Sequence, residues 1–176
     1  MKIVSLLPAA TEILCDMGLA EYISAVSHEC DYPSTINNKL KITSSIIPHN
    51  INQNAIDKLV KEAVKNNIPL YEVDNEQLNK INPDLIITQG LCDVCSISED
   101  KIQATLKNNL CTLSSNTEII SLNGITFDEI CSDILRIGIA VNKEEIAQKL
   151  IKEAVDTKHK ITKERSSNSL LLLEWI

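Results

Sequence analysis

The chain has 176 residues, 44% of them hydrophobic, and a formal net charge of −7 at pH 7. This length is enough for one domain with a full core, or for one domain and the start of another. The negative charge argues against nucleic acid as a partner, since binding it requires a basic surface. One Trp, one Phe and three Tyr provide no aromatic platform on which bases could stack.

The N-terminal stretch MKIVSLLPAATEIL has one lysine and a short apolar run that ends at Pro8. It lacks the longer apolar core and the small-residue cleavage site of a signal peptide. The longest apolar run, four leucines at 170–173, is far shorter than a membrane span. We therefore expect a cytoplasmic protein from the sequence as written. Its six cysteines are then reduced thiols or ligands rather than a disulfide framework.

Apolar runs alternate with helical patterns in the first part of the chain. The runs 2–7 and 22–27 predict strands, and residues 10–19 between them predict a helix that Gly18 ends. A strongly amphipathic pattern predicts a helix over 52–67. The other predicted elements are strands at 69–73, 83–88 and 118–122 and helices at 75–81 and 98–108.

This alternation is typical of an α/β fold with a mostly parallel sheet and helices on both faces. The strands are continuous apolar runs because parallel strands are buried on both faces. From about residue 126 the pattern becomes helical, over 126–141 and again over 143–166. As a helix, the second stretch would extend roughly 35 Å. After a polar break, Leu170–Ile176 predicts a strand that would begin an incomplete second domain.

Two cysteines, Cys92 and Cys95, lie on the loop that follows the strand predicted at 83–88. In an open parallel sheet, ligands bind outside the carboxyl ends of the strands, because loops and helix N-termini converge there. The loop 27–33 follows another predicted strand and ends at the same edge. We therefore expect Cys92 and Cys95 to lie on a ligand-facing rim, not in the core, together with His28, Glu29 and Cys30.

The rim thiols allow four interpretations. They are buried packing residues, as free cysteine often is, or a Cys-x-x-Cys redox pair, although such pairs usually lie at a helix N-terminus. They contact an organic or corrinoid ligand, or they bind a metal. Three thiols and one imidazole would meet the tetrahedral requirement of Zn²⁺, and the candidate ligands are His28, Cys30, Cys92 and Cys95.

Catalytic motifs are absent from the sequence. None of the four glycines belongs to a G-x-G-x-x-G or P-loop motif, and no Ser-His-Asp order with a nucleophile elbow is present. These absences favour a binding module that is not an enzyme. The alternatives are a truncated product without activity and a Zn or Fe–S protein or enzyme that uses the same four thiol and imidazole residues.

Four segments, KIVSLLPAATEIL, SHECDYP, NPDLIITQGLCDVC and LLLEWI, together resemble the helical-backbone (class III) substrate-binding proteins of ABC importers. The resemblance covers the whole chain and is strongest to the cobalamin-binding branch. It implies two Rossmann-like lobes joined by one long rigid helix, with the ligand in the cleft between them. Residues 1–125 would be the N-terminal substrate-binding lobe, 126–166 the helical connector, and 167–176 the start of a truncated C-terminal lobe. A full member needs roughly another hundred residues.

The resemblance also implies a ligand and partners. The ligand would be cobalamin, another corrinoid or another metal chelate, and the partner an ABC permease, on whose arginines Glu76 would dock. A solvated glutamate in the first turn of a helix is the alternative reading of Glu76. Transport members of the family are periplasmic or on the cell surface. Ala9 stands where the family usually has a serine. The ligand-binding residues implied are Pro8, Ala9, Thr11, His28, Glu29, Cys30, Tyr32, Gln89, Cys92 and Cys95.

Overall fold

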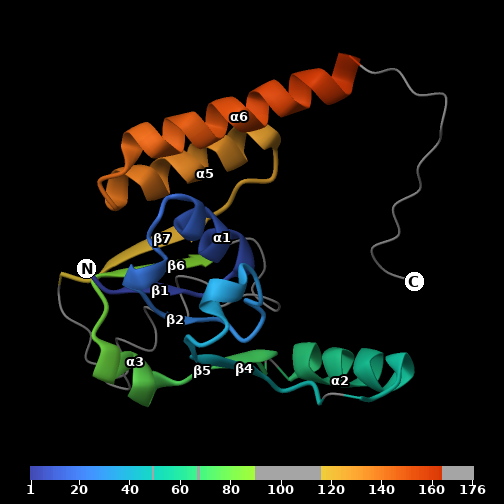
Figure 1. Ribbon diagram of the computed structural model, residues 1–176. Coiled ribbons are helices and arrows are strands. Elements are labelled where there is room, and N and C mark those ends of the chain that lie inside the picture. The colour runs from blue at the N-terminus through green and yellow to red at the C-terminus, as the bar shows by residue number, and fades with distance from the viewer. Residues whose placement is uncertain (49, 67, 90–115, 164–176) are drawn as a thin grey trace.

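The computed structural model describes residues 1–48, 50–66, 68–89 and 116–163. Its main sheet has five strands in the order β3-β2-β1-β6-β7, and every pairing within it is parallel (Figure 1). The α/β fold with a mostly parallel sheet is therefore confirmed. The strands are β1 (Ile3–Ser5), β2 (Ile23–Val26), β3 (Leu40–Lys41), β6 (Leu85–Gln89) and β7 (Glu118–Leu122).

The order of the strands reverses at the centre of the sheet. The chain runs outward from β1 through β2 to β3, and it then returns to place β6 and β7 on the other side of β1. Open sheets bind ligands beside such a reversal, at the carboxyl ends of the strands. The described helices are α1 (Pro8–Asp16), α2 (Gln53–Lys65), α3 (Asn75–Ile81), α5 (Phe127–Ala140) and α6 (Glu144–Lys163), with short 3₁₀ turns η1 (Ala20–Tyr22) and η2 (Ser34–Ile36).

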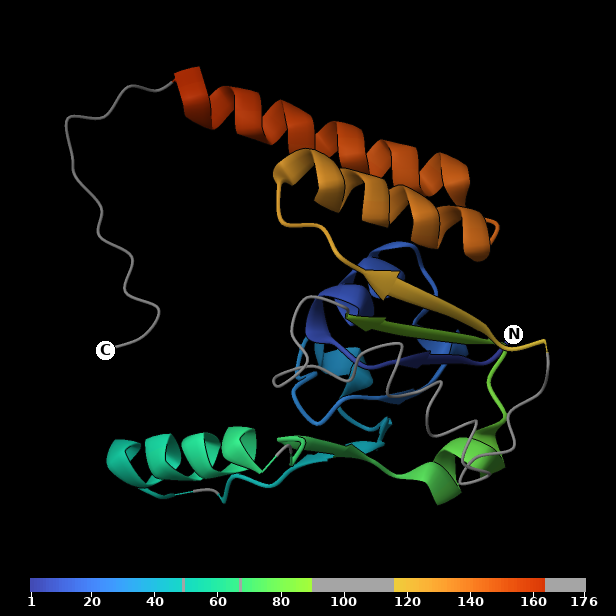
Figure 2. The ribbon, with the colours of Figure 1, turned by 180° about the vertical axis from the view of Figure 1, so that it is seen from behind.

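Both faces of the sheet are covered, as the continuous apolar runs predict. On one face, Ile3 and Ile87 pack with residues of α1, α5 and α6. On the other face, Val4 and Ile86 pack against Leu78 of α3. Figures 1 and 2 show α5 and α6 on one side of the sheet and α3 on the other.

A two-stranded antiparallel ribbon lies beside the main sheet. It pairs β4 (Thr43–Ser45) with β5 (Tyr71–Val73). The strand predicted at 69–73 is thus present as β5. The alternation of strands and helices in the sequence did not indicate that this strand belongs to a separate ribbon. The helix α2 follows β4 in the chain and extends away from the sheet (Figure 1).

The helices α5 and α6 form an antiparallel hairpin joined at Asn142, which has a positive φ of 55°. A Cβ atom on Gly138 would lie only 2.4 Å from Cβ of Ala147, so the two helices touch where no side chain fits. Ile137 and Val141 of this hairpin join the same core as β1 and β6. The two predicted helices are confirmed over their described residues.

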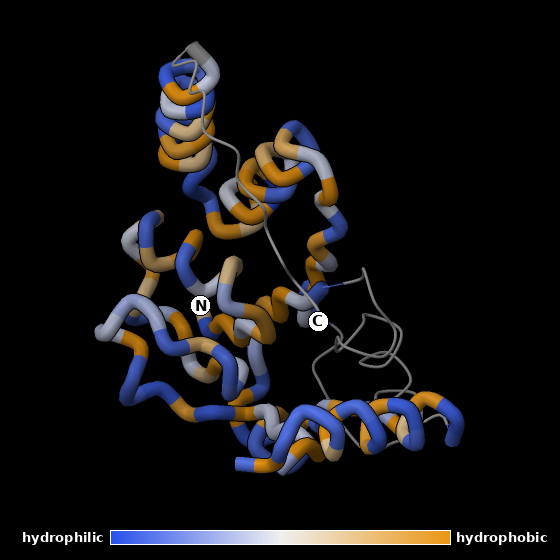
Figure 3. Tube along the Cα trace, turned by 90° about the vertical axis from the view of Figure 1, so that its right-hand side faces the viewer, coloured by the Kyte–Doolittle hydropathy of each residue, from blue (hydrophilic) through white to orange (hydrophobic). Residues whose placement is uncertain are grey.

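Figure 3 shows polar and apolar residues interspersed along α2 and α6, as expected of helices with one apolar face. Within the described ranges, no helix is both long enough and apolar enough to cross a membrane. The predicted helix at 98–108 and the predicted strand Leu170–Ile176 lie outside the described residues.

Candidate ligand-binding rim

The carboxyl ends of the parallel strands bring three of the predicted site segments to one edge of the sheet. Ser5 of β1 pairs with Val26 of β2 and with Ile87 of β6, so the loops after these strands leave side by side. Pro8 begins α1 and is half-buried, and Gln89 ends β6 and is also half-buried. We call this edge, with the described residues of the loops that leave it, the rim.

The loop after β2 carries several exposed side chains of the described rim. Tyr32 is 64% exposed and the Glu29 side chain 59%. Asp31 between them is also exposed, as is Ala9 on α1. The N-cap of α1 is Leu7, which makes no side-chain cap hydrogen bond, and Ala9 already lies within the helix. An aromatic ring and two carboxylates are therefore available to a ligand here.

Cys30, which was predicted to lie on the rim, lies beneath it, and so does Thr11, which the resemblance implied as a ligand-binding residue. Both are 0% exposed, as is Ser5. Thr11 Oγ1 lies 2.8 Å from Ser5 Oγ and 3.2 Å from Cys30 Sγ. The backbone N–H of Cys30 donates to the Ser27 carbonyl oxygen at 3.1 Å, and this tight turn accompanies a thiol that is directed inward. The prediction that the Cys30 side chain lies on the rim is wrong for this structure.

Burial also affects the reactivity of Cys30. It raises the pKa of the thiol, and this effect outweighs the hydrogen bond with Thr11, which lowers the pKa. A thiol with a raised pKa stays protonated at neutral pH and is a weak nucleophile. Burial likewise raises the pKa of Cys15.

His28 is held in place by its neighbours. Its backbone N–H donates to Thr43 Oγ1 at 2.9 Å, and its Nδ1 lies 2.6 Å from the same oxygen. Thr43 Oγ1 in turn donates to Ser27 Oγ at 3.2 Å. The imidazole also lies against the Tyr71 ring, with centroids 5.3 Å apart. His28 therefore connects the loop after β2 to the ribbon.

The second nitrogen of His28 faces Glu29. Nε2 lies 3.2 Å from Glu29 Oε1 but not in the geometry of a hydrogen bond, and it has no hydrogen-bond partner among the described residues. Because the His28 side chain is only 22% exposed, the imidazole forms part of the rim wall and does not project from it.

The predicted metal site gains no support. No group of three His, Cys, Asp or Glu side chains in the described parts of the chain is arranged to hold a metal ion. Of the four predicted ligands, Cys92 and Cys95 lie outside the described residues, and Cys30 lies in the core.

The hydroxyl groups that support the rim were not predicted from the sequence. Ser5 and Ser27 each end or follow an apolar strand, and this polar position at the end of an apolar run was a readable signal. Thr43 offered no such signal, because the polar segment that contains it was not predicted to be a strand.

Glu76 lies in the first turn of α3, where its side chain is 79% exposed. Its Oε1 is 2.6 Å from Nζ of Lys80, and this contact raises the pKa of Lys80. Glu76 therefore lies at the surface, where it forms an ion pair with Lys80 on the next turn of the helix.

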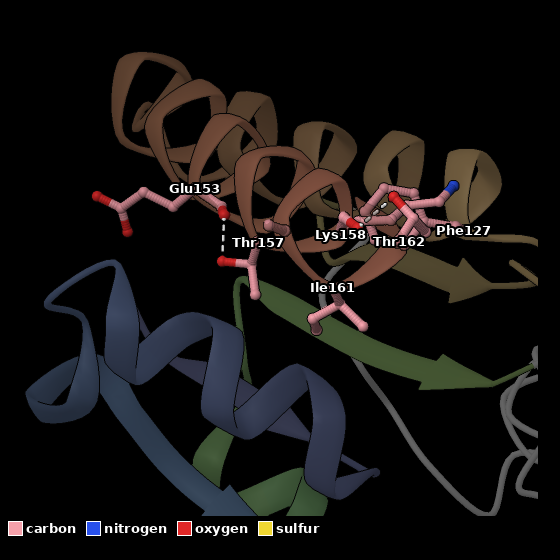
Figure 4. A pocket seen from close by; sticks show the side chains of 7 residues that line it. Phe127, Glu153, Thr157, Lys158, Ile161 and Thr162 are labelled. Carbon is pink, nitrogen blue, oxygen red and sulfur yellow. Dashed lines mark hydrogen bonds between the residues drawn. The ribbon is translucent and has the colours of Figure 1, made fainter. Parts of the chain in front are cut away.

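A shallow groove of about 500 Å³ lies between the start of α5 and the distal half of α6 (Figure 4). Lys158 Nζ is positioned over the Phe127 ring, 4.2 Å from its centroid. The groove is mostly apolar and is lined by Phe127, Glu153, Ala154, Thr157, Lys158, Ile161 and Thr162.

Comparisons with known proteins reveal the fold but no sequence relative. No family model matches the chain, and no curated protein matches its sequence. Among solved structures, one from Staphylococcus epidermidis, described as a possible iron-binding (periplasmic solute-binding) protein, is 24% identical with a TM-score of 0.61. That match covers 92% of this chain and 49% of the other.

Two structures from Vibrio cholerae are similar in the same way. The periplasmic vitamin B12-binding protein BtuF is 22% identical with a TM-score of 0.58, over 90% of this chain and 48% of that one. The periplasmic heme-binding protein HutB is 19% identical with a TM-score of 0.62, over 96% and 51%. The chain thus spans about half the length of the structures it matches. Over that half, it has the fold of periplasmic solute-binding proteins.

Proposed function

We propose that this chain forms one wall of the ligand cleft in the solute-binding component of an ABC importer. The ligand is cobalamin, another corrinoid or another metal chelate such as heme. The observation that carries the proposal is the rim: exposed Tyr32 and Glu29 lie at the carboxyl edge of a parallel sheet. The matched structures with this fold are described as binding proteins for iron, vitamin B12 or heme.

The side chains of the rim suit a chelate better than a free metal ion. A chelate carries its own metal ligands, so the wall needs only ring contacts and a few hydrogen bonds. The Tyr32 ring offers a flat apolar surface for a macrocycle, and the Gln89 amide at the end of β6 offers donors and an acceptor. The held imidazole of His28 adds a polar group of fixed orientation.

The proposed domain division rests on the resemblance and on the length of α6. Residues 1–125 would form the substrate-binding lobe, and α6 would be the connector to a second lobe. With 20 residues, α6 is roughly 30 Å long, and it extends beyond the start of α5 (Figure 1). An ABC permease would be the partner, with Glu76 at the docking surface.

The ligand proposal is tested by titrating the chain with cyanocobalamin and with hemin, followed by absorbance. We expect a saturable spectral change at one ligand per chain. Replacing Tyr32 by Ala should weaken binding about tenfold, because an aromatic contact is lost. Tyr22→Ala is the matched control: Tyr22 is 47% exposed but precedes β2, at the opposite edge of the sheet.

Two outcomes would count against the proposal. One is the absence of a saturable change with either ligand. The other is equal weakening by Tyr32→Ala and Tyr22→Ala, which would place binding away from the rim.

A further inference from the structure

The turn between β7 and α5 is clamped by two carboxylates. Asp133 Oδ2 accepts hydrogen bonds from the backbone N–H groups of Asn123 at 3.0 Å and Gly124 at 2.8 Å. One helical turn earlier, Glu129 Oε2 accepts from the N–H groups of Ile125 at 3.0 Å and Thr126 at 2.8 Å. Four consecutive backbone donors are thus bound by α5 itself. We call residues 123–126 the clamped turn.

Two further contacts fix the clamped turn. Asp133 is only 8% exposed, and its Oδ1 accepts from Nη1 of Arg136 at 2.9 Å, which holds the carboxylate in place. Gly124 presses on the first turn of α5, where an added Cβ would lie 2.8 Å from the backbone nitrogen of Ile130. The turn is therefore rigid, and its N–H groups are not available to bind an anion.

The clamped turn presents one apolar side chain to solvent. Ile125 is 78% exposed, more than the other exposed large hydrophobic residues among the described ones. Ile125 precedes the N-cap of α5, a position from which an apolar residue often packs on the fourth helical residue, here Ile130. Most of its surface nevertheless stays exposed, and a preordered apolar contact favours ligand binding, since little conformational entropy remains to be lost.

The position of the turn links it to the rim. Leu122 at the end of β7 pairs with Gln89 at the end of β6, so the clamped turn leaves the sheet at the same edge. The loop with Tyr32 follows β2, three strands away in the order β2-β1-β6-β7. At 4.7–4.9 Å between neighbouring strands, these two loops start about 14 Å apart.

We propose that Ile125 is an apolar contact at the far end of the same ligand site. The rim then spans the sheet from the loop after β2 to the clamped turn, and it selects ligands wide enough to reach both, with an apolar edge on the side of Ile125. This fits a tetrapyrrole-sized macrocycle and excludes a free ion or a small chelate. The inference rests on the proposed function, because it assigns a further contact to that site.

The experiment titrates the native chain, Ile125→Ser and Ile139→Ser with cyanocobalamin and hemin, followed by absorbance. For whichever of the two ligands reaches both Tyr32 and Ile125, we expect Ile125→Ser to weaken binding about tenfold. This is the effect of losing one good apolar contact. Ile139 on α5 is 56% exposed, and its replacement should leave affinity unchanged. Tyr32→Ala serves as the reference variant at the other end of the rim.

The results separate the inference from the proposed function. If Tyr32→Ala weakens binding and Ile125→Ser does not, the site exists but Ile125 is outside it, and the inference is wrong. If the native chain binds neither ligand, the proposed function fails and the inference with it.

Amide hydrogen exchange at 123–126 tests the clamp without any ligand: exchange should be slow in the native chain and faster in Asp133→Asn. Fast exchange in the native chain would show that the turn is not rigid.

Discussion

At the scale of single residues, the sequence indicates which loops form the rim but not how deep each side chain lies. His28, Glu29 and Cys30 are neighbours in one loop, yet they are half-buried, exposed and fully buried respectively. The difference arises from one tight turn closed by the N–H of Cys30 and the carbonyl oxygen of Ser27. Free cysteine tolerates both environments, so residue type alone could not decide this position.

The depth of Cys30 predicts its reactivity. With iodoacetamide at pH 7.5, Cys30 should be modified at least about tenfold more slowly than the half-buried Cys131, because its thiol is inaccessible and its pKa is raised. Peptide mapping by mass spectrometry measures both rates in one sample. In denaturant the two rates should converge. Equal rates in the folded chain would place Cys30 at the surface after all.

At the scale of secondary-structure elements, long periodic segments were predictable and short polar ones were not. The patterns over 52–67 and 126–141 give α2 and α5, because one apolar face repeats over several turns. The two strands that were missed, β3 and β4, are two and three residues long. Their exposed or polar residues pair through the backbone, which leaves little trace in the sequence.

The capping box of α5 predicts a pH dependence. Hydrogen bonds from the N–H groups of Thr126 and Ile125 lower the pKa of Glu129 in the folded chain. A lowered folded-state pKa stabilises the fold fully above the unfolded Glu pKa of about 4.3, and this contribution disappears as pH falls through the lower folded value. Glu129→Gln should therefore lower the thermal midpoint at pH 7 and have no effect at pH well below 4.

The matched control for this measurement is Asp128→Asn. Asp128 lies in the same first turn and feels the same helix dipole, but its carboxylate makes no hydrogen bond to the clamped turn. Equal shifts in the two variants would assign the effect to the dipole rather than to the hydrogen bonds.

The contact between α5 and α6 predicts a second stability effect. Gly138→Ala improves helix propensity by about 1 kcal/mol, but the new Cβ would lie 2.4 Å from that of Ala147. We expect overpacking to prevail, with a net loss of about 1–3 kcal/mol in the free energy of unfolding. Urea titration measures the loss. The double variant Gly138→Ala/Ala147→Gly should recover part of it, and no recovery would show that the strain lies elsewhere.

At the scale of the whole molecule, the sequence predicts the fold class and the binding edge but not the strand order. Continuous apolar strands predict burial on both faces, and parallel strands predict converging loops. Which side of β1 receives β6 has no local signature, since it depends on long-range pairing. The clamped turn could be predicted in part from the sequence, because Thr126 and Glu129 have capping-box spacing. The hydrogen bonds of Asp133 to this turn could be identified only from the structure.

The proposed lobe of residues 1–125 shares its core with the helical connector, so we expect that it does not fold without α5 and α6. The hairpin of α5 and α6 contributes Ile137, Val141 and Ala147, all at most 4% exposed, to the core that covers β1 and β6. Burying Ile137 and Val141 is worth about 1.5–3 kcal/mol each, a large share of a net stability of about 5–15 kcal/mol.

A chain ending at residue 125 should therefore bind the dye ANS and lose its cooperative thermal transition. A chain ending at residue 163 retains both helices and should unfold cooperatively, near the midpoint of the full chain. A cooperative transition in the shorter chain at that same midpoint would instead establish residues 1–125 as a separate domain.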